Sequence, residues 1–411
     1  MNSILKDFKT LPREVWFFFF MILINRMGAM VVPFMSKYLY EDLKFSYTEI
    51  GTIMMCFGAG SIVGTFLVGK ISKNISSYKL MICSMFFNGV ILFSLQFVKN
   101  FYSLCFTVFL LNVVADMFRP SMMATLKDFV KKEDRIKAFS LMRTASNFGF
   151  IISPIIAGIS IATIGYYLLF YIDGLSSIAA VLFFVTFVKE KKLLHKLTFS
   201  NLNEEKFVFL KDKLLLIHCL ITVITGIIFF QIFSVLPLYY TDILKQSPTF
   251  NTYTLVFYGL ILFLLEVAVV SYIKNKGIKT LNAILYGLIL MVFGYLILVL
   301  LQQTIGVFLA LLFISFGVML TFPFAADFVL ERSYKKMEAK FLSYFQMCYG
   351  IAQFLSAKLS LFIIHKLGYN TNFFLNIVLG ITGAILSYFL INLVIKERRD
   401  KKAAIVNSFF K

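Results

Sequence analysis

Twelve long runs of apolar side chains constrain the fold of this 411-residue chain more than any other feature. Each run is close to, or longer than, the roughly 20 residues with which an α-helix crosses the hydrocarbon core of a bilayer. A helix satisfies its backbone hydrogen bonds within itself, so these runs are predicted to be transmembrane helices. We place them at residues 14–38, 47–69, 80–98, 101–124, 138–164, 167–188, 213–241, 251–273, 280–300, 305–330, 340–364 and 371–395.

The composition agrees with a membrane protein and disagrees with a soluble one. Hydrophobic residues make up 60% of the chain and charged residues only 15%, against roughly 25% charged in a soluble globular protein. The first apolar run is too long for the core of a signal peptide, and no small-residue cleavage site follows it, so it is predicted to stay as the first membrane helix. The predicted fold class is therefore an all-α integral membrane protein with twelve transmembrane helices.

The net charge of +19 comes from lysines and arginines in the short loops between the apolar runs. They form no basic surface interleaved with aromatic residues, so nucleic acid is not an expected partner. Most of the 40 Lys and Arg residues fall in alternate loops, and the positive-inside rule then places both termini in the cytoplasm. The exceptions, assigned to outer loops, are Lys37, Lys44, Lys99, Lys245 and Lys366.

An internal repeat relates the first six runs to the last six. Pairs of identical residues recur at one constant spacing: Pro120 and Pro323, Lys137 and Lys340, Ser140 and Ser343. Pro33 and Pro237 also occupy corresponding places in the first run of each group. Two parallel repeats of six helices are typical of secondary transporters.

The repeat predicts four parts of the chain. Residues 1–188 and 213–395 are the two six-helix bundles, 189–212 is a cytoplasmic linker and 396–411 is a basic cytoplasmic tail. The basic loops are expected to lie against anionic headgroups, which makes membrane lipids a partner. We expect a multi-pass monomer in the cytoplasmic (inner) membrane.

Four stretches of the sequence resemble the major facilitator superfamily, in particular its bacterial drug-efflux-like branch of proton antiporters. They are Ile24-Asn25-Arg26-Met27-Gly28 with Pro33-Phe34, Asp116-Met117-Phe118-Arg119-Pro120, Gly149 with Ser153-Pro154 and Ala157-Gly158, and Gly317 through Pro323-Phe324-Ala325 with Lys340. The third is similar to the antiporter motif of helix five. The resemblance implies two bundles that rock about a midplane site lined by helices one, four, seven and ten.

One loop departs from the pattern of that family. Between the second and third helices the family has an Asp-Arg pair where this chain has Lys73 and Asn74. The resemblance implies that the contact which steadies the outward-open state is altered or absent. Structural or gating roles are accordingly assigned to Lys73, Asn74, Arg143, Gly149, Pro154, Gly158 and Pro323.

Carboxylates inside membrane helices are costly and therefore are candidate functional groups. Asp116 and Arg119 are three residues apart and share one face of a helix. Asp116 either takes up a proton and frees an arginine, or belongs to a permanent ion pair. Glu266 is a lone carboxylate, either a proton carrier or a hydrogen-bonded structural group. These two are the proton-coupling candidates, whereas Asp173 and Asp327 are expected to have capping or hydrated roles.

Polar groups on the predicted cavity helices are the substrate candidates: Asn25, Arg26, Arg119, Gln231 and Lys358. Arg26 lies near the middle of its helix and remains charged at physiological pH. If it is unpaired it favours an anionic or neutral polar solute, and if it pairs with Asp116 it leaves the substrate unconstrained. Lys358 either meets an anionic substrate group or extends towards the outer interface.

The sequence gives no pattern for enzyme chemistry or for ATP use. Three histidines have no metal-binding or nucleophile partner at a recognisable spacing, and five cysteines lie unpaired inside apolar runs. No cofactor is expected, and protons are the simplest coupling partner. The leading hypothesis is proton-coupled export of a small organic solute by alternating access. Import of a metabolite or iron chelate and a transport-inactive sensor or scaffold are the alternatives.

Overall fold

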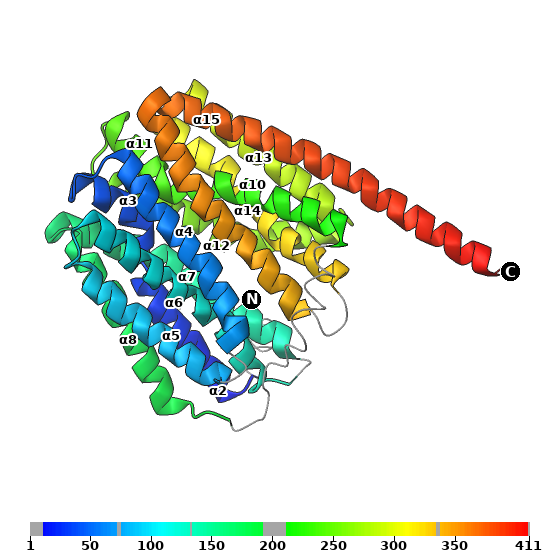
Figure 1. Cartoon of the computed structure of the whole chain (residues 1–411), viewed down its shortest axis with the longest axis horizontal. Helices are drawn as coiled ribbons and strands as arrows, with labels where there is room; N and C mark the ends of the chain where they lie inside the picture. Colours follow the sequence, from blue (N-terminus) through cyan, green and yellow to red (C-terminus); the bar gives the residue numbers. More distant parts are fainter. Residues whose placement is uncertain (1–10, 72–74, 132–133, 192–210, 334–337, 410–411) are drawn as a thin grey trace. The chain divides into compact units, whose positions relative to one another are not determined.

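The computed structural model describes residues 11–71, 75–131, 134–191, 211–333 and 338–409, and within them all regular structure is helical (Figure 1). The helices are α2 (Arg13–Gly28), α3 (Val31–Glu41), α4 (Tyr47–Ile71), α5 (Ser77–Leu95), α6 (Phe101–Lys127), α7 (Arg135–Thr163), α8 (Tyr167–Phe187), α10 (Lys213–Ser234), α11 (Leu236–Asp242), α12 (Phe250–Asn275), α13 (Thr280–Leu300), α14 (Thr304–Arg332) and α15 (Glu338–Phe409).

The described helices confirm the predicted number of membrane spans. Eleven segments are long and apolar enough to cross a bilayer, and the last of them, Tyr344–Asp400, is longer than one crossing. At Gly368 the backbone has φ 83° and ψ 173°, a conformation that only glycine adopts readily, and it divides α15 into two helices. Figure 1 shows the sharp turn, where α15 changes direction between its orange and red parts. The chain therefore has twelve spans.

Two of the predicted helices are broken, which the sequence analysis did not anticipate. The first run divides into α2, which ends at Gly28, and α3, which begins at Val31. Pro33 explains the break, because it has no N–H to donate to the carbonyl four residues earlier. The seventh run divides in the same way between α10 and α11, where Pro237 is the second helical residue. The repeated prolines thus produce the same break in both halves of the chain.

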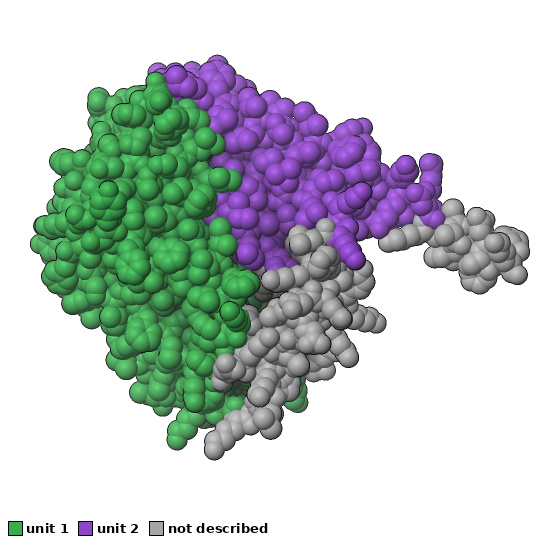
Figure 2. Space-filling view, in the orientation of Figure 1, with its two compact units in different colours: residues 1–200, 230–263, 353–366 green, residues 201–229, 264–352, 367–411 purple. Residues whose placement is uncertain are grey.

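Two compact units make up the chain, coloured green and purple in Figure 2. Unit 1 contains residues 1–200, 230–263 and 353–366, and unit 2 contains residues 201–229, 264–352 and 367–411. The predicted bundle boundaries at 188 and 213 stay a prediction. The linker at 189–212 lies mostly outside the described residues, and so do Lys73 and Asn74.

Each unit has its own apolar core. In unit 1, α2 packs against α7 and α8, while α6 packs against α4 and α5. Its core includes Phe18, Met81 and Phe184, which are 2% exposed or less. In unit 2, α13 packs against α14, and the core includes Leu288 and Phe345. Lipid supplies no hydrophobic driving force between helices, so this close packing holds them together.

Candidate functional site

Four charged side chains of unit 1 come together in the interior of the membrane-spanning region. Arg26 of α2 interacts electrostatically with Asp116 and Arg119 of α6 and with Asp173 of α8. We call these four residues the charged cluster. They come from three helices: α2 and α8, which pack against each other, and α6, which packs against α4 and α5.

Close contact between α2 and α7 sets the place of Arg26. A side-chain carbon added to Gly149 would lie 2.4 Å from Cβ of Arg26 and 2.9 Å from its carbonyl carbon. Only glycine therefore allows α7 to approach α2 here, which gives a physical role to the first glycine of the helix-five motif. Arg26 is exposed although it belongs to a membrane-spanning helix.

Asp173 bridges the break in the first span. Its Oδ2 accepts hydrogen bonds of 3.2 Å from the backbone N–H groups of both Met30 and Val31, and the residue is only 4% exposed. Both amides lie at the start of α3, whose dipole also favours a negative charge, and the Met30 amide donates to the Gly28 carbonyl at 2.8 Å as well. The expected capping role is therefore present, but Asp173 caps α3 from α8 and not an end of its own helix.

Asp116 has polar partners without forming an ion pair. The Ser61 hydroxyl of α4 lies beside it, and Arg119 and Arg26 act on it electrostatically. Within the described part of the chain, no carboxylate lies at ion-pair distance from either arginine. The Arg26–Asp116 ion pair that the sequence left open is therefore not formed in this structure.

Asn25 and Gln231 are both engaged in helix packing within unit 1. Asn25 donates from Nδ2 to the Ser177 hydroxyl of α8 at 2.9 Å. Gln231 is fully buried and donates from Nε2 to the hydroxyls of Ser356 at 3.3 Å and Ser360 at 2.5 Å. Gln231 therefore joins the seventh and eleventh spans, and any contact with a substrate requires another conformation.

Lys358 and Glu266 differ from what the sequence predicted. Lys358 donates from Nζ to Thr52 Oγ1 of α4 at 2.5 Å, so it does not extend to the interface. Glu266, on α12 in unit 2, is partly buried and is not without a partner, so it is not a lone carboxylate. Arg143 is exposed on α7, where its charge acts on that of Arg119.

The remaining motif residues act through the backbone. A side-chain carbon at Gly158 would lie 2.4 Å from the Thr252 hydroxyl oxygen, so this glycine permits contact between α7 and α12. Pro154 and Pro323 lie inside α7 and α14. Asp327 accepts a 3.3 Å hydrogen bond from Thr280 Oγ1 in unit 2, in line with the minor role expected for it.

A second polar group in unit 1 was missed by the sequence analysis, because Lys37 had been placed in a loop. Lys37 belongs to α3 and its side chain is fully buried. Its Nζ lies 3.5 Å from Glu41 Oε1 and donates to the Pro248 carbonyl at 3.1 Å. Glu41 also accepts from Tyr166 Oη at 2.5 Å and from Thr241 Oγ1 at 3.1 Å. We call Lys37, Glu41, Tyr166 and Thr241 the Lys37 network.

The Lys37 network joins the first half of the chain to segments of the second half that belong to unit 1. Burial, and then the charge of Glu41, raise the pKa of Tyr166, which therefore remains a donor. Ser36 donates to the Phe233 carbonyl at 3.0 Å, the acceptor that Pro237 leaves free. The spacing of Lys37 and Glu41, one helical turn apart, was the signal available in the sequence.

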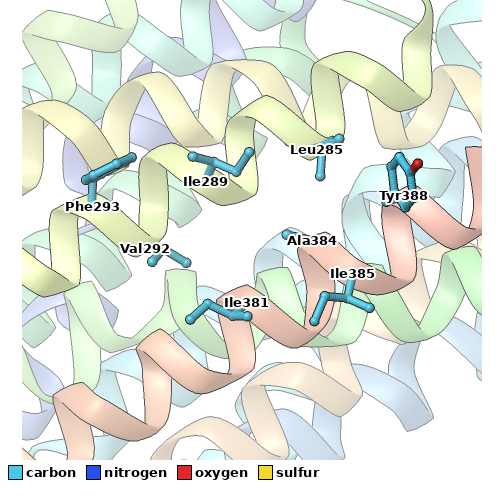
Figure 3. A pocket seen from close by; sticks show the side chains of 8 residues that line it. All are labelled: Leu285, Ile289, Val292, Phe293, Ile381, Ala384, Ile385 and Tyr388. Carbon is cyan, nitrogen blue, oxygen red and sulfur yellow. The ribbon is translucent and has the colours of Figure 1, made fainter.

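An apolar groove lies in unit 2 between α13 and α15, with a volume of about 480 Å³ (Figure 3). Its lining has one polar atom, the Tyr388 hydroxyl, and consists of Leu285, Ile289, Val292, Phe293, Ile381, Ala384, Ile385 and Tyr388. A solute site needs convergent polar groups. This groove lacks them and suits lipid contact, so the charged cluster is the candidate site.

The sequence profile of the Major Facilitator Superfamily matches residues 18–357. The chain belongs to this superfamily. It is therefore a multi-pass membrane protein of a transporter superfamily and not of an enzyme family. The resemblance seen in the four sequence stretches is confirmed.

The similar proteins do not identify the substrate or the direction of transport. The quinolone resistance protein NorA of Staphylococcus aureus (strain MSSA476) is 23% identical over 242 residues, which are 57% of this chain and 61% of that relative. NorA of strain MRSA252 is 22% identical over 316 residues, 75% of this chain and 78% of that protein. The chain spans only about three fifths of the length of the first of these relatives.

Solved structures of transporters share the fold. The nucleoside transporter NupG has a TM-score of 0.73 and 15% identity, covering 93% of this chain and 99% of its own. A POT family transporter in complex with 5-aminolevulinic acid has a TM-score of 0.77 and 14% identity, covering 94% and 96%. At such identities the similarity concerns the fold alone.

Proposed function

We propose that this transporter is driven by protons and that Asp116 is the side chain that takes up and releases the proton. The proposal is based on the groups that surround the Asp116 carboxylate. It is partly buried, it lies beside the Ser61 hydroxyl, and two arginines act on it without an ion pair among the described residues. A carboxylate in a permanent ion pair would keep its charge, whereas this one is free to change it.

The mechanism follows from electrostatics in a medium of low dielectric constant. When Asp116 is ionised, it offsets part of the positive charge of Arg26 and Arg119. When Asp116 is protonated, both arginines lose that compensation and bind another anion more strongly. Protonation thus changes the substrate affinity of the cluster, which is what coupling requires. Alternating access then carries the loaded site across the membrane.

Two directions of transport have specific support. Export, the leading hypothesis from the sequence, is supported by the similarity to NorA, whose name describes drug resistance, and by the antiporter-like run of Gly149, Pro154 and Gly158. Uptake is supported by the positive surroundings of Asp116. The protein works as a monomer in the cytoplasmic membrane, with membrane lipids around it.

Accumulation of labelled compounds in cells tests both the coupling and the direction. Cells that make the protein should hold less of an exported compound, or more of an imported one, than cells without it, and an uncoupler should remove the difference. Asp116→Asn should abolish the uncoupler-sensitive part while leaving exchange of labelled for unlabelled compound. The matched control is Asp42→Asn, an exposed aspartate outside the cluster, which should transport normally.

Flux that persists under an uncoupler would refute proton drive. An Asp116→Asn protein that unfolds would indicate a structural role, so its thermal unfolding midpoint should be compared with that of the unmodified protein. Absence of any difference between producing and non-producing cells, across a broad panel, would favour the sensor or scaffold alternative.

A further inference from the structure

The charged cluster is balanced while both of its aspartates are ionised, but it becomes positive when Asp116 takes up a proton. Asp173 is already engaged, because it accepts hydrogen bonds from the Met30 and Val31 amides. Arg26 and Arg119 are exposed and, among the described residues, lie at ion-pair distance from no carboxylate.

The guanidinium groups of Arg26 and Arg119 also repel each other. The positive charges of Arg26 and Arg119 act on each other, and Arg119 also interacts electrostatically with the exposed Arg143 of α7. Like charges that are held together by packing in a membrane protein need a counter-ion. Among the described residues no carboxylate lies at ion-pair distance from Arg26 or Arg119, so a bound anion can fill this role once Asp116 is protonated.

The geometry points to a small organic anion as the substrate, its carboxylate or phosphonate group bound by Arg26 and Arg119 while Asp116 carries a proton. This inference rests on the proposed function and adds the substrate class and the sense of coupling. Guanidinium groups suit the role because each offers planar, paired donors that match carboxylate and phosphate oxygens. A lipophilic cation would meet repulsion at the same place.

The sense of coupling follows from the charges around Asp116. The groups that face it are Arg119 on α6, Arg26 on α2 and Ser61 on α4, with Asp173 and Arg143 one step further out. Protonation of Asp116 removes the nearest negative charge, so an anion binds more strongly. By reciprocity the anion also favours the protonated state. Proton and anion therefore travel together, which supports uptake over export.

Thermal unfolding of the purified protein, with candidate ligands present, tests the inference without any proton gradient. Benzoate, succinate and phenylphosphonate are the anionic probes, benzamide and succinamide their neutral counterparts, and benzylamine the cation. Ligands that bind the folded state raise the unfolding midpoint. We expect at least one acid to raise it more than its neutral counterpart, and more so in mildly acidic than in mildly alkaline buffer.

Substitutions test whether the acids bind at the charged cluster. Arg26→Gln and Arg119→Gln should each weaken acid binding by about ten- to a hundredfold, the loss expected for one hydrogen bond to a charged group. Arg13→Gln is the matched control, because Arg13 is an exposed arginine at the start of the same helix as Arg26. Asp116→Asn should retain acid binding and lose its pH dependence.

Three results would overturn the inference: no acid raises the midpoint, benzylamine raises it as much as the acids do, or Arg13→Gln loses binding as Arg26→Gln does. Failure of the proposed function gives a different pattern. Acid binding that depends on Arg26, together with transport that an uncoupler does not affect, would preserve the anion site and refute the proton drive.

Discussion

At the scale of single residues, the two carboxylates of the charged cluster have different roles because their partners differ. Asp173 accepts two backbone N–H groups at a helix start, whereas Asp116 has one hydroxyl and the charges of two arginines. The two backbone N–H groups hold the Asp173 carboxylate in place. Without this carboxylate, the Val31 amide has no acceptor among the described residues. The sequence alone does not distinguish the roles of Asp116 and Asp173, since both are aspartates within apolar runs.

Asp173→Ala should therefore destabilise the protein, while Asp173→Asn, which keeps an acceptor oxygen, should destabilise it less. Each buried N–H left without a partner costs about 1–3 kcal/mol. The measurement is the thermal unfolding midpoint in detergent, compared with Ser176→Ala, whose hydroxyl bonds only within its own helix. An alanine variant as stable as the unmodified protein would show that the cap contributes nothing.

At the scale of elements, the Lys37 network joins α3 to segments near α11 and α12 within unit 1. Alternating access requires the contacts between the two halves of the chain to break in turn. Glu41 is central, since it binds Lys37, Tyr166 and Thr241 at once. The network is thus expected to hold these segments together in one of the two transport states.

Glu41→Ala should loosen this contact, because it leaves the buried Lys37 with the Pro248 carbonyl alone. In a cysteine-free background, a cysteine at position 36, which is fully buried, should react faster with a membrane-impermeant maleimide. The control is Glu49→Ala, whose carboxylate bonds only the neighbouring Ser46. Equal labelling rates in the two variants would contradict the role of Glu41.

At the scale of the whole molecule, the twelve spans and the distribution of lysine and arginine predict the orientation in the membrane. An even number of crossings places both termini on one side, and the more basic loops identify that side as the cytoplasm. The same rule predicts that the altered loop at Lys73 and Asn74, which lies outside the described residues, is on that side too. The orientation therefore determines on which side of the membrane the Lys37 network lies.

A cysteine introduced at position 201 should therefore not be labelled from outside intact cells, whereas one at position 99 should be. Both are made in the cysteine-free background, and permeabilised cells provide the reference for complete labelling. External labelling at 201 would reverse the topology, and with it the side on which Lys37 and Glu41 lie.

The apolar runs determined the spans and their number, because transfer of a helix into lipid depends on local composition. The internal repeat and the four family-like stretches then indicated the transporter fold. The tertiary structure decided which charges are compensated. Asp173 meets its amides 142 and 143 residues away, and folding brings the Pro248 carbonyl to Lys37 from 211 residues away. Such partners are distant in sequence, and the hydropathy of a lysine alone predicts that it faces water.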